Sequence, residues 1–176
     1  MPTSLYDLSV PTYLQTVRSI GACLDKAVAH SAEHGIDPDD FVEARLVADM
    51  APLWFQIECV DNYSVWGLDA IRHGAFTPPA LVGAVPFSAL RDRISGTEAA
   101  LAALEPDEVN AWSGKALDIR IHTQPETSAF TPETYLLSFL MPSFYFHAVT
   151  AYDILRTQGV PIGKSDFEGQ LRVDPR

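Results

Sequence analysis

The chain has 176 residues and is 47% hydrophobic, which is enough to build the core of one domain, and we expect that domain to span residues 1–176. Its 12 basic and 23 acidic residues give a formal net charge of −11, which disfavours binding to phosphate backbones or anionic lipid. No apolar run reaches the roughly 20 residues of a membrane-spanning helix, and no signal peptide is recognisable. We therefore expect a cytoplasmic protein that binds neither nucleic acid nor membranes.

Apolar residues recur at spacings of three and four along four stretches of the sequence, and this is the period of an amphipathic helix. The first stretch ends at Gly35. Pro11 stands near its start, either in the first turn or at a kink that follows a lead-in from Ser4. Residues 37–46 are expected to form a short helix, because an aspartate cap is followed by a proline and two more acids.

The second and third long helices are expected at about residues 51–73 and 87–104, and Pro106 ends the third. The period then changes to that of a strand, because apolar and polar residues alternate over residues 117–122. A turn and a second short strand at residues 128–130 would complete a hairpin.

The fourth long helix is expected at residues 131–159, and the residues after Pro161 are expected to form an extended tail. These patterns predict an all-α fold. Its architecture would be an antiparallel four-helix bundle with a small β-hairpin inserted before the last helix.

One histidine falls on the most apolar face of the last helix. The expected inward seam contains Leu137, Leu140, Phe144, His147, Ala151 and Ile154. An imidazole in that position must be hydrogen-bonded, metal-bound or catalytic, since burying an unpaired polar group costs about 1–3 kcal/mol. Gln56 and Tyr63, on the inward seam of the second helix, are its expected partners. Pro142 should bend the last helix and leave the Ser138 carbonyl without a donor.

Two interpretations of this polar position are open. In the first, His147 is only a structural hydrogen-bonding residue that specifies packing. In the second, it lies in a pocket as a general acid or base. The candidate ligand-binding residues are then Trp54, Gln56, Tyr63, Phe144, Tyr145 and Ala151.

The outer face of the second helix carries an acidic ridge of Glu58, Asp61 and Asn62, which is expected to be solvated. Trp54 and Trp66 lie near this ridge, and we expect them to form part of a homodimer interface, because monomers rarely expose large apolar patches.

The cysteines and the remaining histidines give no metal site by their spacing. Cys23 and Cys59 are far apart within helical patterns, so we expect reduced core thiols. His30 and His34 are four residues apart, but no acid follows the first one as in a zinc-protease motif.

Several short motifs resemble a branch of the DinB/YfiT-like superfamily that is known only as a domain of unknown function. They are SLYDLSVP (4–11), ARL (44–46), FYFH (144–147), AYDILR (151–156) and IGKSDF (162–167). The resemblance implies the same helical bundle, often assembled as a dimer. Members of the wider superfamily commonly bind zinc or nickel through three histidines. Of the three corresponding positions in this chain, only His147 is a histidine, because Gln56 and Ala151 occupy the other two.

We therefore expect no metal and no cofactor, and three functions are considered. The first is a small-molecule-binding protein for an apolar organic ligand, whose enzymatic form would be an isomerase, cyclase or lyase using His147. The second is a non-catalytic dimeric interaction or structural protein. The third is a divergent metal-dependent thiol transferase. Whether the protein is an enzyme, and on what substrate, is not determined by the sequence.

Overall fold

The computed structural model describes residues 3–120 and 126–173. The described chain is mostly helical, with one antiparallel pair of strands. Its elements in chain order are α1 (Leu5–His34), the 3₁₀-helix η1 (Pro38–Phe41), α2 (Leu53–Asp61), the π-helix η2 (Asn62–Trp66), α3 (Gly67–His73), α4 (Phe87–Ala102), α5 (Pro106–Asn110), β1 (Leu117–Arg120), β2 (Thr127–Phe130), α6 (Pro132–Tyr135), the π-helix η3 (Leu136–Leu140), α7 (Met141–Thr157) and α8 (Lys164–Glu168).

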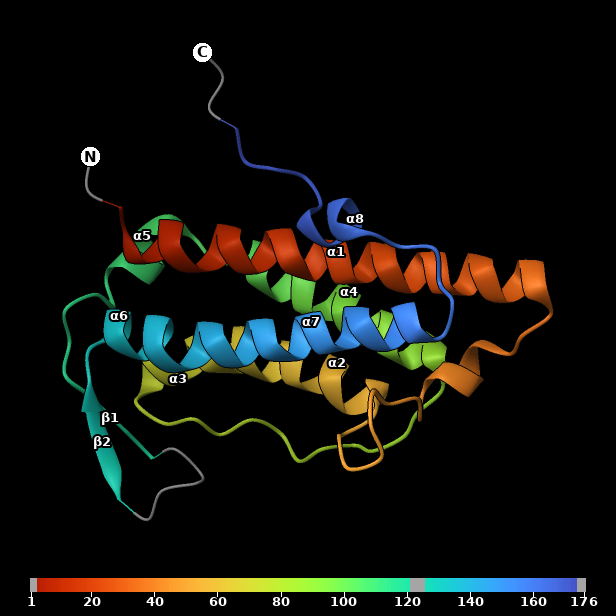
Figure 1. Ribbon diagram of the computed structural model, residues 1–176. Coiled ribbons are helices and arrows are strands. Elements are labelled where there is room, and N and C mark those ends of the chain that lie inside the picture. Colours follow the sequence, from red (N-terminus) through yellow and green to blue (C-terminus); the bar gives the residue numbers. More distant parts are fainter. Residues whose placement is uncertain (1–2, 121–125, 174–176) are drawn as a thin grey trace.

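The long helices share one apolar core. Helices α1 and α2 each contact both α4 and α7. Figure 1 shows these helices lying lengthwise beside one another, with the hairpin projecting at one end, next to α6. In the hairpin, β1 pairs antiparallel with β2, from Leu117 opposite Phe130 to Arg120 opposite Thr127. The predicted helical fold with a small hairpin before the last helix is confirmed.

Helix α1 begins where the sequence places a cap. The Ser4 side chain accepts a hydrogen bond from the backbone N–H of Asp7, and the Asp7 carboxylate accepts one from the Ser4 N–H, which together form a capping box. Pro11 therefore lies inside the helix, in agreement with a helix that starts at Ser4. The helix ends at Gly35, whose φ of 66° is left-handed and suits a residue without a Cβ.

Two of the predicted continuous helices each contain a π turn. A π turn holds one residue more than an α turn, so the side chains on its two sides are rotated by roughly 100° relative to a regular helix. This explains one error in the predicted seam of the last helix. Leu137 is 49% exposed, whereas its neighbour Leu136 is fully buried. Pro142 lies two residues after the end of η3, so the π turn provides the local adjustment that a proline inside a helix requires.

Three further expectations need correction. Residues 37–46 form only the four-residue η1, which ends at Phe41. The third long helix ends at Ala102, and Pro106 opens a further short helix, α5. The predicted extended tail contains α8, in which the Asp166 carboxylate accepts a hydrogen bond from the Gly163 N–H and pairs with Lys26 on α1. Residues 121–125, which include part of the predicted strand and turn, lie outside the described residues.

Candidate ligand site around His147 and Tyr63

His147 and Gln56 form the central polar contact of the site. Nδ1 of His147 lies 2.7 Å from Oε1 of Gln56, so the predicted hydrogen bond between α7 and α2 is present. The imidazole is partly rather than fully buried, and it flanks a core stripe on α7 that contains Phe144, Ala148 and Ala151.

A second hydrogen bond of Gln56 determines which nitrogen of His147 carries the proton. Nε2 of Gln56 donates to the Ala51 carbonyl at 2.9 Å, which fixes the orientation of the amide. Oε1 is then the atom that faces Nδ1, and a carbonyl oxygen can only accept. Nδ1 of His147 is therefore the donor, and the lone pair of the neutral ring is on Nε2.

Burial also determines the charge of this ring. Desolvation lowers the pKa of His147 from 6.5 to about 4, because the protonated form loses its hydration. At pH 7 the imidazole is neutral. Among the residues that the structure describes, Nε2 has no hydrogen-bond partner, so it can accept a hydrogen bond from a ligand.

Aromatic rings surround the imidazole. Tyr63 stacks on His147 with ring centroids 5.4 Å apart and an interplanar angle of 8°. Phe76 also stacks on Tyr63, with ring centroids 5.8 Å apart and an interplanar angle of 19°. Phe55 and Phe146 meet the imidazole edge to face, at 5.8 and 5.2 Å. Such contacts add dispersion and quadrupole attraction to the burial of apolar surface.

The two π turns position these rings. Tyr63 belongs to η2, and Phe139 of η3 meets it edge to face at 5.8 Å. The helices approach closely here because Gly67 has no side chain. A Cβ at Gly67 would lie 2.7 Å from a methyl carbon of Leu140, which is too close for an ordinary contact. Since π turns occur frequently at functional sites, two of them beside one histidine favour a binding role.

A pocket of about 170 Å³ lies beside Tyr63, and His147 is not among its lining residues. Its lining residues are Phe55, Cys59, Asn62, Tyr63, Phe76, Pro78 and Leu81. The first four belong to α2 and η2, and the last three to the irregular residues 74–86, which run back along α2 in Figure 1.

Of the predicted ligand-binding residues, Tyr63 lines this pocket and the others do not. Phe144 and Ala151 are fully buried in the core. Tyr145 packs against Phe144 at 5.4 Å, and Nε1 of Trp54 donates to the Glu43 carboxylate at 3.1 Å. Whether any of these residues binds a ligand stays a prediction. The sequence analysis missed Phe76 and Phe139. Phe76 carried no usable signal, because it lies in a segment without periodicity.

The predicted solvated ridge is instead a buried polar network, so this expectation was wrong. Glu58 is 2% exposed and Asn62 7% exposed. Arg93 on α4 pairs with Glu58 at 3.3 Å and with Asp61 at 3.5 Å, and Thr97 donates to Asp61 at 2.8 Å. These partners explain the burial, because α4 brings a cation against the acidic face.

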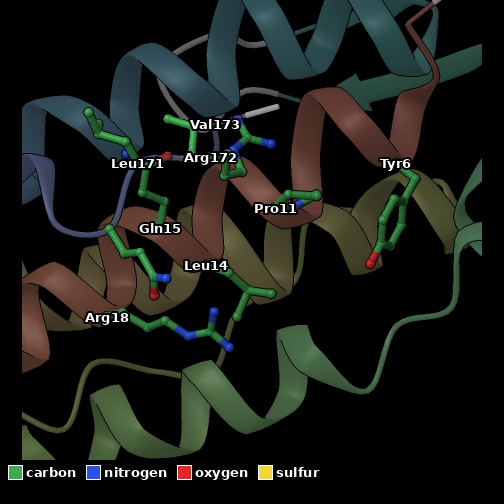
Figure 2. Close-up of a pocket in the computed structure, with 9 residues that line it drawn as sticks. Tyr6, Pro11, Leu14, Gln15, Arg18, Leu171, Arg172 and Val173 are labelled. Carbon is green, nitrogen blue, oxygen red and sulfur yellow. The ribbon is translucent and has the colours of Figure 1, made fainter. Parts of the chain in front are cut away.

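A larger hollow, of about 450 Å³, lies elsewhere and contains none of the predicted site residues. Figure 2 shows it between the first half of α1 and residues 170–173. Among its lining residues, Arg18 pairs with Glu98 and Arg172 donates to Thr12. Because the larger hollow has no cluster of aromatic rings, we regard the smaller pocket beside Tyr63 as the better candidate.

Metal ligation has little basis in the described part of the chain, where no group of three His, Cys, Asp or Glu side chains could hold an ion. The rings of His30 and His34 lie 4.2 Å apart, but Nδ1 of His34 is engaged by the His30 carbonyl. Cys23 and Cys59 are both free and buried, as predicted.

The comparisons with known proteins agree with the motifs found in the sequence. The family described as a domain of unknown function, DUF1993, matches residues 5–168. The chain belongs to this family. A crystal structure of a DinB family member from Shewanella denitrificans superposes with a TM-score of 0.83 at 25% identity, covering 98% of this chain and 96% of the other. The predicted place in the DinB-like superfamily is thus confirmed. No curated protein matches the chain.

Among residues 3–120 and 126–173, no helix is both long and apolar enough to span a bilayer.

Proposed function

We propose that this DUF1993 protein binds a small, mostly apolar organic molecule at the aromatic cluster around His147 and Tyr63, without a metal. The observation that carries the proposal is the engagement of Nδ1 by Gln56, which leaves Nε2 as an acceptor. The neighbouring rings offer faces for an apolar ligand, and Nε2 offers one directional hydrogen bond. Ligand sites are commonly of this kind, apolar with a few placed polar groups.

The acid–base role predicted for His147 is less favoured by its surroundings. A general base works best when its pKa is near the working pH, and a pKa of about 4 makes His147 a weak base at pH 7. We therefore propose hydrogen-bond acceptance as its main role. An isomerase, cyclase or lyase step at this residue would need a ligand that raises its pKa on binding.

We also infer an antiparallel four-helix bundle that forms a homodimer. The mutual contacts of α1 and α2 with α4 and α7 support the bundle. For the dimer, Trp54 and Trp66 are both partly buried, which weakens the predicted interface. The last helical segment instead exposes an apolar stripe of Leu137 (49%), Phe146 (57%) and Val149 (41%). Phe146→Asp should convert a dimer to a monomer in light scattering. A monomeric mass for the unmodified protein would contradict the inference.

Substitution of the imidazole by the two carboxamides tests the binding role. Asparagine at position 147 places an N–H near the position of Nδ1 and removes the acceptor at Nε2, whereas glutamine places its amide near Nε2. We expect His147→Asn to keep most of the stability and to lose binding of aromatic fragments that carry an O–H or N–H donor. His147→Gln should retain part of it.

Ring resonances of His147, followed by NMR during titration with a panel of such fragments, give the measurement. The exposed His73 is the internal control, because it lies on α3 outside the cluster. Equal binding by the unmodified protein and His147→Asn would show that Nε2 has no part in recognition.

A further inference from the structure

The pocket beside Tyr63 has a polar group whose bonding is incomplete. Asn62 lines the pocket and is only 7% exposed. Among the described residues, its Oδ1 has no hydrogen-bond partner. An unpaired buried acceptor costs about 1–3 kcal/mol, so a native structure seldom keeps one without a reason. A ligand that supplies a donor would remove this cost.

The rest of the lining consists of aromatic rings, two apolar side chains and a thiol. Tyr63, Phe55 and Phe76 contribute aromatic rings, and Pro78 and Leu81 are the two apolar side chains. Burial raises the pKa of the Cys59 thiol to about 12, with the neighbouring Glu58 contributing, so the sulfur stays neutral and acts as an apolar contact. The pocket therefore offers no charge to pair with an ionised ligand.

The size of the pocket limits the ligand further. Its volume is about 170 Å³. An apolar cavity of about 150 Å³ is known to hold a benzene ring, so this pocket fits one aromatic ring with a small substituent. A ligand ring that packs face to face or edge to face against Tyr63 or Phe76 would extend the stack that these two side chains already form.

The segment that covers the pocket is held in place by a buried carboxylate. The backbone N–H of Val82 donates to Oε1 of Glu58 at 3.1 Å, and Arg93 pairs with the same oxygen. Residues 76–81, which supply three of the lining side chains, lie between this anchor and the end of α3. Residues 76–81 are thus held by a carboxylate whose burial costs desolvation free energy. This indicates an ordered binding site and not a loosely attached loop.

From these observations we propose that the pocket between α2, η2 and residues 76–81 binds an uncharged, single-ring aromatic compound carrying an O–H or N–H donor, and that the Asn62 carboxamide recognises the donor. This inference rests on the proposed function, because it names the ligand class of the same aromatic cluster, and it adds Asn62 as the residue that determines specificity.

Two probes of nearly equal shape test the proposal. 4-Fluorophenol carries the donor and 1,4-difluorobenzene lacks it, and ¹⁹F NMR can follow the binding of both. The unmodified protein should bind 4-fluorophenol about threefold to tenfold more tightly, as expected for one net hydrogen bond. Asn62→Leu should abolish this preference while leaving the affinity for 1,4-difluorobenzene within about twofold. Equal affinities for the unmodified protein, or a preference that survives Asn62→Leu, would overturn the proposal.

Labelling of the native protein gives a second measurement that does not depend on the variant. 4-Fluorophenol should slow alkylation of Cys59, which lines the pocket, and leave the rate at Cys23 unchanged. Protection of both thiols or of neither would also count against the site.

His147→Asn separates this inference from the proposed function. If the preference for the phenol persists in His147→Asn, the Asn62 site stands and the role of Nε2 fails. If the preference is lost in His147→Asn and kept in Asn62→Leu, the reverse holds. Failure of both probes to bind the unmodified protein would reject both.

Discussion

The side chains of Gln56 and His147 lie 2.7 Å apart, Oε1 to Nδ1, although 91 residues separate them in the sequence. The contact joins α2 to α7. Because Nε2 of Gln56 donates to the Ala51 carbonyl, Oε1 faces the imidazole and Nδ1 of His147 is the donor. One amide therefore fixes both the tautomer of the imidazole and the direction in which its lone pair is available.

The low pKa of His147 predicts how this residue contributes to stability at different pH values. The pKa is about 4 in the folded protein against 6.5 for the free side chain, so the unfolded chain binds more protons between these values. The contribution is fully present above pH 6.5 and is lost as the pH falls through 4. It amounts to at most about 3 kcal/mol.

Urea unfolding of the unmodified protein and of His147→Gln from pH 7.5 to 4 checks this expectation. The difference in unfolding free energy should be constant above pH 6.5 and should shrink below it. Comparing the two proteins cancels the titration of shared carboxylates. A difference that does not depend on pH would show that His147 is protonated as easily in the folded state.

Gln56 should be needed for the state of His147. Gln56→Leu removes the acceptor for Nδ1–H and the donor for the Ala51 carbonyl, and we expect a loss of about 1–3 kcal/mol. Gln56→Glu is nearly isosteric and places a carboxylate beside the ring, so the pKa of His147 should rise from about 4. NMR titration of the His147 ring measures the shift. An unchanged pKa in Gln56→Glu would contradict the assigned contact.

The close approach of the two π turns depends on Gly67. Gly67→Ala places a methyl group 2.7 Å from Leu140, which is fully buried and cannot swing into solvent. Overpacking costs about 1–3 kcal/mol, which exceeds the gain of up to about 1 kcal/mol from replacing glycine in a helix. We expect a net loss of stability in thermal unfolding.

Gly96→Ala is the matched control, because a Cβ there meets nothing within 4 Å. It should stabilise the protein by about 0.5–1 kcal/mol. Leu140→Ala combined with Gly67→Ala should cost less than the sum of the two single changes. Equal effects of Gly67→Ala and Gly96→Ala would show that the helices do not approach closely at Gly67.

Both thiols should react slowly in the folded protein. Burial raises the pKa of Cys23 to about 11 and that of Cys59 to about 12, so very little thiolate exists at pH 7.5. Iodoacetamide should modify both residues far more slowly in the folded protein than after urea has unfolded the chain, and mass spectrometry can count the adducts. Rapid modification of Cys59 alone under native conditions would indicate that residues 74–86 open frequently.

Metal content remains a prediction to be measured. Gln56 and Ala151 stand where histidines would be required in the metal-binding relatives, and a single imidazole is too few for a stable site. Elemental analysis of protein purified without added metal should find no near-stoichiometric zinc or nickel. Near-stoichiometric zinc or nickel that is present in the unmodified protein and absent from His147→Asn would contradict this prediction.

The sequence alone determined the positions of the four long helical segments, the two ends of the first helix and the inward direction of His147 and Gln56. These features follow from local rules. Each of these signals involves only a few consecutive residues: the capping box at Ser4, the helix-ending Gly35 and the apolar spacings of three and four. They can therefore be recognised without knowing which helices become neighbours.

Only the tertiary structure decided the features that depend on partners far away in the sequence. The π turns shifted the seam from Leu137 to Leu136, and no local pattern marks where a helix gains a residue to fit its neighbour. Glu58 is polar by sequence but buried, because Arg93 on another helix compensates its charge. The pocket at Asn62 exists because residues 76–81 fold back over α2, where the Glu58 carboxylate anchors Val82 and is itself paired with Arg93 of α4.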